Sequence, residues 1–338
     1  MKKTLICLLL ALTLVAALEP HVRGRIAQTL SGLTAQQEEQ AETADAPTFS
    51  QQLGGASRTD ILDVTLYFRF ADTGVLGAQQ AQLDIRREET VATSIVQKLI
   101  DGPDIAHEHL SGVFPQGTRV ISVTGEETTA FVTLSGSFLG RPDGAPADWE
   151  DLPEWQEEAA LRRRLAVQSI TLALTEDGRF QRVQLYVAEN DDEIPQRIPL
   201  ALMDTRITDP ALVLAACPRD EQALLTPGCA LEMAMQAWQA QDWAALYPLM
   251  TQAQDEALPT LTVFETEMAD LGISLLTYSV SPGSVSFDGQ SATLVLDAEI
   301  RSRDGGDAQI VRESVPLCRV QDNWAMELKT LRSLMIRD

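Results

Sequence analysis

The chain has 338 residues, of which 45% are hydrophobic, and its 49 acidic and 26 basic residues give a net charge of −23. At about 100–200 residues per domain this length predicts two domains, and the apolar content excludes a wholly disordered chain. The acidic excess disfavours partners that carry phosphate charge, namely nucleic acid and an anionic membrane surface. His107 and His109 lie two residues apart, which is too little for a metal site, so we expect no metal and no cofactor.

The first residues have the pattern of an export signal. Two lysines precede an apolar run over residues 5–18, which is shorter than the roughly 20 residues of a membrane span. Val15 and Ala17 permit cleavage after Ala17, and an uncleaved anchor is the alternative. We therefore expect residues 1–24 to be a signal peptide or anchor. The protein would then be extracytoplasmic, either secreted or anchored to the cytoplasmic membrane by this segment, with no other contact to the membrane.

Residues 25–58 are rich in Gln, Glu, Ala and Thr and contain few large apolar side chains. Such a composition cannot offset the entropy lost on ordering, so it predicts a flexible linker. From Leu62 to Phe70 apolar and polar residues alternate, which predicts a half-buried strand, and a second strand is expected over 83–87. A helix over 91–100 should begin after Thr90 and end at Gly102.

The remainder of the first domain continues this mixture of strands and helices. Two strands over 119–124 and 130–135 flank a hairpin turn, and a loop over 140–153 leads into a helix over 154–175 and a strand over 182–187. Arg162, Arg163 and Arg164 are expected on the solvated face of that helix. The order predicts an α+β sandwich with helices on one sheet face, within a domain spanning 59–208.

A Pro-containing connector over 190–210 separates this domain from a second one, expected over 217–338. Helical patterns near 231–245 and 264–271 come first. Strands are then expected over 275–280, 285–287, 292–300, 311–320 and 324–331. Helices followed by a long antiparallel sheet predict a cone-shaped α+β domain with a curled sheet.

Export would place Cys217, Cys229 and Cys318 in a milieu that permits disulfides. We expect one disulfide, with Cys217–Cys229 favoured because the two residues flank a segment that contains Pro and Gly. Cys229–Cys318 is the alternative pairing. Three buried, reduced cysteines are the remaining interpretation.

Seven blocks in the first domain, taken in order, resemble the GerMN domain family, named for the GerM sporulation and germination protein. They are VTLYF at 64–68, IRRE at 85–88, LIDGP at 99–103, FPQGTRVISV at 114–123, AFVTLS at 130–135, ITLALTED at 170–177 and RVQLYV at 182–187. The resemblance implies a small α+β unit, similar to ring-building modules, that packs through strand edges and helix faces. The second domain resembles the nuclear-transport-factor-two-like superfamily, on the pattern of Trp238, Trp243, Tyr247 and Trp324.

We therefore expect a non-enzymatic, exported cell-envelope protein. The resemblance implies a scaffold or assembly factor of a sporulation or germination complex, with envelope or sporulation-complex proteins, or further copies of itself, as partners. The expected contact surfaces are the Tyr67 side of the first strand and the helix over 159–173. The alternative function is a small-ligand-binding protein or enzyme that uses a pocket of the cone domain lined by Tyr247, Tyr278 and Asp297.

Overall fold

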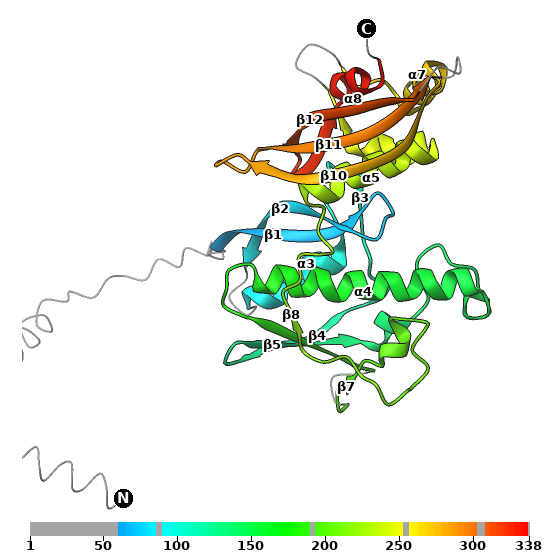
Figure 1. Ribbon diagram of the computed structural model, residues 1–338. Coiled ribbons are helices and arrows are strands. Elements are labelled where there is room, and N and C mark those ends of the chain that lie inside the picture. Colours follow the sequence, from blue (N-terminus) through cyan, green and yellow to red (C-terminus); the bar gives the residue numbers. More distant parts are fainter. Residues whose placement is uncertain (1–59, 86–89, 190–192, 253–256, 303–307, 337–338) are drawn as a thin grey trace, which may run out of the picture. The chain divides into compact units, whose positions relative to one another are not determined.

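The structure is a computed structural model that describes residues 60–85, 90–189, 193–252, 257–302 and 308–336 (Figure 1). The expected signal or anchor over 1–24 and the expected linker over 25–58 lie outside the described residues. The described part is a mixed α+β fold. Its N-terminal half (60–218) holds two sheets with helices between them, and its C-terminal half (223–336) holds one sheet with its own helices.

The first sheet is built on a long hairpin and has the strand order β2-β1-β3. Its members are β1 (Asp60–Phe70), β2 (Leu76–Ile85) and β3 (Leu110–Ser111). The predicted strand is confirmed, but it is not half-buried as expected, because both faces of its C-terminal part are covered: Leu66, Tyr67, Phe68, Arg69 and Phe70 are all buried. β2 begins well before the expected residue 83, because its polar glutamines and small residues hide the alternation. Ala71 and Asp72 form the turn with φ of 44° and 55°.

The second sheet has the order β4-β5-β6-β7, with a short β8 also paired to β6. Its strands are β4 (Val120–Glu126), β5 (Thr129–Ser135), β6 (Arg182–Ala188), β7 (Gln196–Arg197) and β8 (Cys217–Pro218). β5 and β6 are parallel, and parallel neighbours need a long crossover connection such as the one that joins them. Three 3-10 helices lie in the connections: η1 (Gly136–Leu139), η2 (Trp149–Asp151) and η3 (Leu200–Leu202).

Helices α3 (Val91–Asp101) and α4 (Pro153–Thr175) lie between these two sheets (Figure 1). This corrects the expectation that the helices cover one face of a single sheet. The capping prediction for α3 is confirmed, because Thr90 Oγ1 accepts a hydrogen bond from Thr93 N at 3.1 Å. Gly102 ends the helix with a φ of 94°, a conformation that favours glycine.

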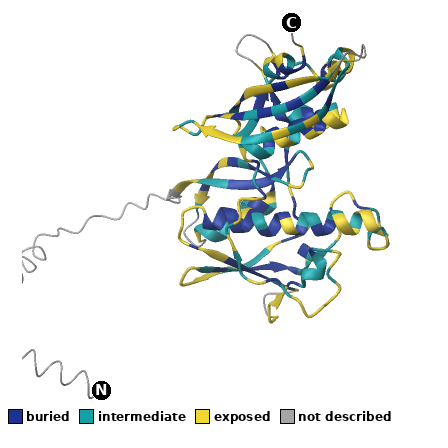
Figure 2. Cartoon of the chain, viewed as in Figure 1, coloured by how far each residue is buried: buried dark blue, intermediate teal, exposed yellow. Residues whose placement is uncertain are grey.

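Helix α4 is buried along most of its length (Figure 2). Ser169 Oγ donates a hydrogen bond of 2.6 Å to the carbonyl oxygen of Tyr67 on β1. Ala166 and Ala173, one turn to either side, are equally buried, and their small side chains let α4 approach the strand. This part of the β1 edge is therefore covered by a helix, which is one way in which proteins protect an edge strand.

Arg163 is a correction to the expected solvated face of α4. Its side chain is only 6% exposed. Its guanidinium donates to the carbonyl oxygens of Leu202 at 3.1 Å and Leu139 at 2.7 Å, and it lies over the ring of Trp149. The arginine thus ties two loop segments to the helix, a role that a run of three arginines in the sequence does not indicate.

The C-terminal half has a five-stranded sheet in the order β10-β11-β12-β13-β9, in which β9 is parallel to β13. The strands are β9 (Met250–Thr251), β10 (Ile273–Val285), β11 (Ser291–Ser302), β12 (Gln309–Val320) and β13 (Asn323–Glu327). The helices are α5 (Pro227–Ala240), α6 (Trp243–Leu246), η4 (Tyr247–Leu249), α7 (Leu261–Leu271) and α8 (Leu328–Met335). The core forms around Trp238, which is fully buried and donates its indole N–H to the carbonyl oxygen of Ile273 at 3.1 Å.

Two sequence expectations for this half are corrected. The strands expected over 275–280 and 285–287 are one strand, β10, interrupted by a bulge between Ser281 and Ser284. The last strand ends at Glu327, and the residues that follow form α8 instead. Leu328, Leu331 and Leu334 are buried at helical spacing. The alternation that precedes them predicts a strand that continues to residue 331, so the sequence pattern hides the start of this helix.

Candidate functional site

The outer edge of β2 is where the two halves meet. In an antiparallel sheet every second residue of an edge strand directs its N–H and C=O away from the neighbouring strand. On β2 these outward residues are Leu76, Ala78 and Gln80. Leu76 N donates to Ala223 O at 2.7 Å, and Leu76 O accepts from Leu225 N at 2.9 Å. The start of the C-terminal half therefore pairs with β2 as a strand would.

Side chains from the β12–β13 turn complete this pairing. Asn323 Oδ1 accepts from Ala78 N at 2.9 Å, and Asn323 Nδ2 donates to Ala78 O at 3.0 Å. Asp322 Oδ2 accepts from Gln80 N at 2.8 Å. The turn has φ of 47° at Gln321 and 66° at Asp322, as in the tight turns that suit hairpins. We call this set of contacts the junction.

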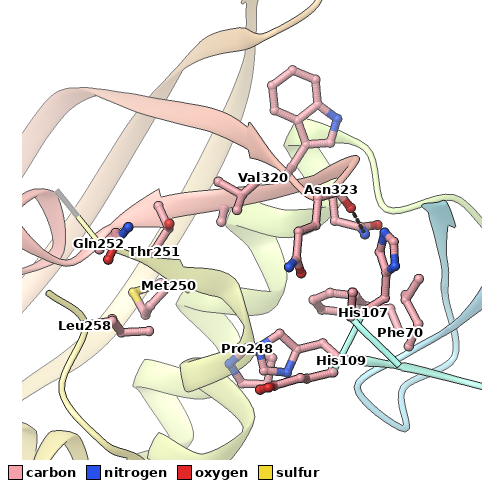
Figure 3. A pocket seen from close by; sticks show the side chains of 16 residues that line it. Phe70, His107, His109, Pro248, Met250, Thr251, Gln252, Leu258, Val320 and Asn323 are labelled. Carbon is pink, nitrogen blue, oxygen red and sulfur yellow. Dashed lines mark hydrogen bonds between the residues drawn. The ribbon is translucent and has the colours of Figure 1, made fainter. Parts of the chain in front are cut away.

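A cavity of about 440 Å³ lies beside the junction (Figure 3). One wall is the segment between α3 and β3, which contributes His107, Glu108 and His109. The opposite wall is β9 and the β12–β13 turn, which contribute polar residues such as Thr251 and Asn323. Figure 3 shows side chains of both halves around one space.

The backbone holds the two histidines firmly. His107 N donates to Asp104 O at 2.9 Å, and His109 O accepts from Ala71 N at 2.8 Å. The His109 ring lies edge-on to Phe70, with 6.4 Å between ring centroids. Burial lowers the pKa of His109, which favours a neutral imidazole at neutral pH. His107 Nδ1 is buried and has no hydrogen-bond partner among the described residues.

This arrangement can bind a small polar molecule through hydrogen bonds. Within the ranges described, no group of three or more His, Cys, Asp or Glu side chains is placed to hold a metal ion. Sequence reasoning noted His107 and His109 as a pair but missed Thr251, Asn323 and the cavity. The available signal was weak, because the spacing of the two histidines does not indicate the turns that hold them, which are closed by the hydrogen bonds from His107 N to Asp104 O and from Leu110 N to His107 O.

A second feature is the tip of the β10–β11 hairpin, where Phe287 is fully exposed and Val285 is 54% exposed. The tip is ordered by its own polar residues. Asp288 Oδ1 accepts from Ser286 Oγ at 2.5 Å and from Gln290 N at 3.0 Å. The hairpin tip, defined as residues 285–290, therefore presents an aromatic ring that the fold leaves uncovered.

The expected contact surfaces are not exposed. Tyr67, on the side of the first strand expected to meet a partner, is only 4% exposed. The helix over 159–173 is buried between the two sheets. Neither surface is available to a partner, because each already packs inside the N-terminal half.

The residues of the expected cone pocket are not brought together. Tyr247 Oη donates to Pro259 O at 2.8 Å, and its ring packs edge-on against Phe264. Tyr278 is paired with Ala298 across β10 and β11. Asp297, the neighbour of Ala298, therefore points to the opposite face of the sheet, where it lies 3.5 Å from Arg312.

The expected Cys217–Cys229 disulfide is not formed. Cys217, Cys229 and Cys318 are all free and half-buried. Cys217 lies in β8, paired to β6 in the N-terminal half, whereas Cys229 lies in the first turn of α5, so the Pro- and Gly-containing segment does not bring them together. Cys318 lies in β12. Burial raises the pKa of each thiol, which keeps it in the unreactive protonated form.

Tyr67 makes a partly buried polar contact instead. Its hydroxyl donates to Glu176 Oε2 at 2.7 Å, and Arg219 Nη1 lies 2.9 Å from the same oxygen. Burial, followed by the hydrogen bond to Glu176, raises the pKa of Tyr67 to about 12, against an opposing effect of Arg219.

We expect this contact to make stability depend on alkaline pH. A raised pKa in the folded state means that the stabilisation is complete below the unfolded pKa of about 10 and is lost as the pH rises toward 12. The free energy of unfolding should fall by about 1 kcal/mol between about pH 9 and pH 11 through this group. Urea unfolding across that range measures it. Tyr67→Phe should flatten the dependence, and an unchanged slope in that variant would contradict the assignment.

Comparisons with known proteins give one family match. Residues 65–193 match the model of the Germane family, described as sporulation and spore germination. This match supports the GerM-like assignment of the N-terminal half. No curated protein matches the chain. None of the described helices is long and apolar enough to cross a membrane.

Several solved structures are similar to parts of the chain. The first GerMN domain of the sporulation protein GerM from Bacillus subtilis is 19% identical with a TM-score of 0.26, covering 40% of this chain and 92% of that one. The tandem GerMN domains of the same protein are 15% identical with a TM-score of 0.29, covering 73% and 64%. A putative lipoprotein from Clostridium perfringens is 18% identical with a TM-score of 0.23, covering 38% and 76%.

Proposed function

We propose that the protein is a non-enzymatic, exported cell-envelope protein that acts through protein contacts, as a scaffold or assembly factor of a sporulation or germination complex. The family match over 65–193 supports the biological setting. The observation that carries the contact role is the hairpin tip, where Phe287 is fully exposed on an ordered turn. Aromatic side chains are frequent anchors of protein interfaces, because one ring buries much apolar area at small entropic cost.

The proposal includes the organisation inferred from the sequence. Residues 1–24 would direct export or anchor the chain, and residues 25–58 would link that segment to a GerMN-like domain over 59–208. A nuclear-transport-factor-two-like domain with a curled sheet would follow over 217–338. In this arrangement the hairpin tip belongs to the second domain, and the first domain is the part that resembles the GerMN family.

The experiment is photocrosslinking in the native cells, with a photoreactive residue at position 287 and partners identified by mass. We expect an envelope protein to be captured at this position. Phe287→Ser should reduce the capture at least tenfold in a pull-down, while the melting temperature stays unchanged because the ring makes no internal contact.

Leu212→Ser is the matched control, since Leu212 is an apolar residue that is 48% exposed but lies outside the hairpin tip. It should leave the capture intact. Equal capture by Phe287→Ser and the parent protein would overturn the proposal.

A further inference from the structure

We propose that the cavity beside the junction binds a neutral saccharide, such as a mono- or disaccharide. This goes beyond the proposed contact function and depends on a different part of the molecule. The volume of about 440 Å³ falls in the range of roughly 300–1,000 Å³ that small-ligand sites occupy. Both halves of the chain contribute to the lining, so a bound ligand would bridge them.

The hydrogen-bonding groups of the lining match sugar hydroxyls. Thr251, Gln252 and Gln321 line the cavity, and their side chains each offer donor and acceptor atoms. A sugar hydroxyl likewise donates and accepts. His107 Nδ1 is buried without a partner among the described residues. Buried polar atoms are rarely left unsatisfied. This nitrogen is closed off from solvent, so a ligand hydroxyl would supply the missing hydrogen bond once the His107 ring turns toward the cavity.

The lining also contains aromatic rings. Phe70 and Trp324 both line the cavity. Phe70 is only 2% exposed, so the half-buried Trp324 is the aromatic residue that a ligand could reach. A pyranose ring has apolar C–H faces between its polar edges. An aromatic side chain beside hydrogen-bonding groups suits such a ligand, because the apolar C–H face of the sugar packs on the ring while its hydroxyls bind the polar groups.

The charges of the lining disfavour anionic ligands. Among the described residues that line the cavity there is no Lys or Arg, and Glu108 is the one carboxylate. A phosphate or carboxylate ligand would find no counter-charge, and the net charge of −23 repels it further. Glu108 is exposed, and His109 is held neutral by burial. An uncharged ligand therefore suits this lining better than an anion does.

The test uses the purified full-length chain and four neutral disaccharides, namely maltose, cellobiose, trehalose and diacetylchitobiose. Saturation-transfer NMR detects binding, and titration calorimetry measures the dissociation constant. We expect at least one of them to bind, while glucose 6-phosphate and glutamate do not. Failure of all four neutral sugars, or tighter binding of a charged probe, would overturn the proposal. Retention on insoluble chitin would identify a glycan chain, rather than a free sugar, as the source of the ligand.

Two variants locate the binding to the cavity. His107→Phe removes the unpartnered nitrogen and should weaken binding at least tenfold. Gln252→Ala changes an exposed side chain, so it keeps the test valid if His107→Phe fails to fold, and it should weaken binding about threefold to tenfold. Leu212→Ser is the control and should bind as the parent does. Unchanged affinity in a folded His107→Phe and in Gln252→Ala would overturn the assignment.

The two proposals fail separately. Phe287→Ser should retain saccharide binding, because the hairpin tip does not line the cavity. Conversely, His107→Phe should retain capture of the envelope partner. A chain that captures its partner but binds no neutral sugar would overturn the saccharide site alone, whereas sugar binding without capture would overturn the contact function alone.

Discussion

Replacing Arg163 with leucine is expected to lower the free energy of unfolding by about 3 kcal/mol. The carbonyl oxygens of Leu202 and Leu139 would lose their donors, and an unsatisfied buried group costs about 1–3 kcal/mol. The leucine leaves no buried charge behind, so the loss reports the missing hydrogen bonds. Urea unfolding followed by circular dichroism measures it.

The controls separate geometry from charge. Arg163→Lys keeps the charge but not the planar fork that reaches two carbonyls, so it should be destabilised to an intermediate degree. Arg206→Leu removes a surface arginine that is 88% exposed in its ion pair with Asp204, and it should unfold as the parent does. A parent-like transition in Arg163→Leu would show that the two loop segments do not depend on the arginine.

The local elements of the N-terminal half could be predicted because their signals are local. The alternation from Leu62 to Phe70, the cap at Thr90 and the stop at Gly102 each lie within a few residues of the structure they specify. The helix over 153–175 and the strands that flank it follow in the same way. These elements agree with the GerM-like resemblance of the same region, which rests on several blocks in order.

The layering could not be predicted from such signals. A buried polar residue such as Ser169 looks like any solvated serine in the sequence, yet it closes the edge of β1. The run of Arg162, Arg163 and Arg164 in the sequence predicts one charged face, although a helix directs adjacent residues to different sides. Burial of single polar groups is decided by tertiary contacts that periodicity does not record.

The candidate sites were missed for a related reason. His107 and His109 form a pair in the sequence, but their spacing predicts no metal site and gives no indication of a cavity. Their counterparts, Thr251 and Asn323, come from the other half of the chain. Phe287 was assigned to a strand, although the Asp-Gly pair that follows it is a turn signal. An aromatic residue inside a turn was the available indication of an exposed ring.

The junction leads to the second large expected effect, because Asn323 carries two of its hydrogen bonds. Asn323→Ala leaves the N–H and the C=O of Ala78 without partners, which should lower the free energy of unfolding by about 2 kcal/mol. The two bonded residues are 245 positions apart in sequence, so these bonds link the halves directly. Weakening them should therefore also reduce the cooperativity of unfolding.

Differential scanning calorimetry tests both parts of this expectation. The parent should unfold in one transition, and Asn323→Ala should show a lower melting temperature with a broadened or divided transition. Gln321→Ala, in the same turn but exposed, should match the parent. Gly77→Ala approaches the contact from the other strand, because its Cβ would lie 2.5 Å from Asn323 Oδ1 and would displace the amide. If Gly77→Ala and Asn323→Ala both keep a single parent-like transition, the halves are coupled by the packing around Leu76 and not by the asparagine.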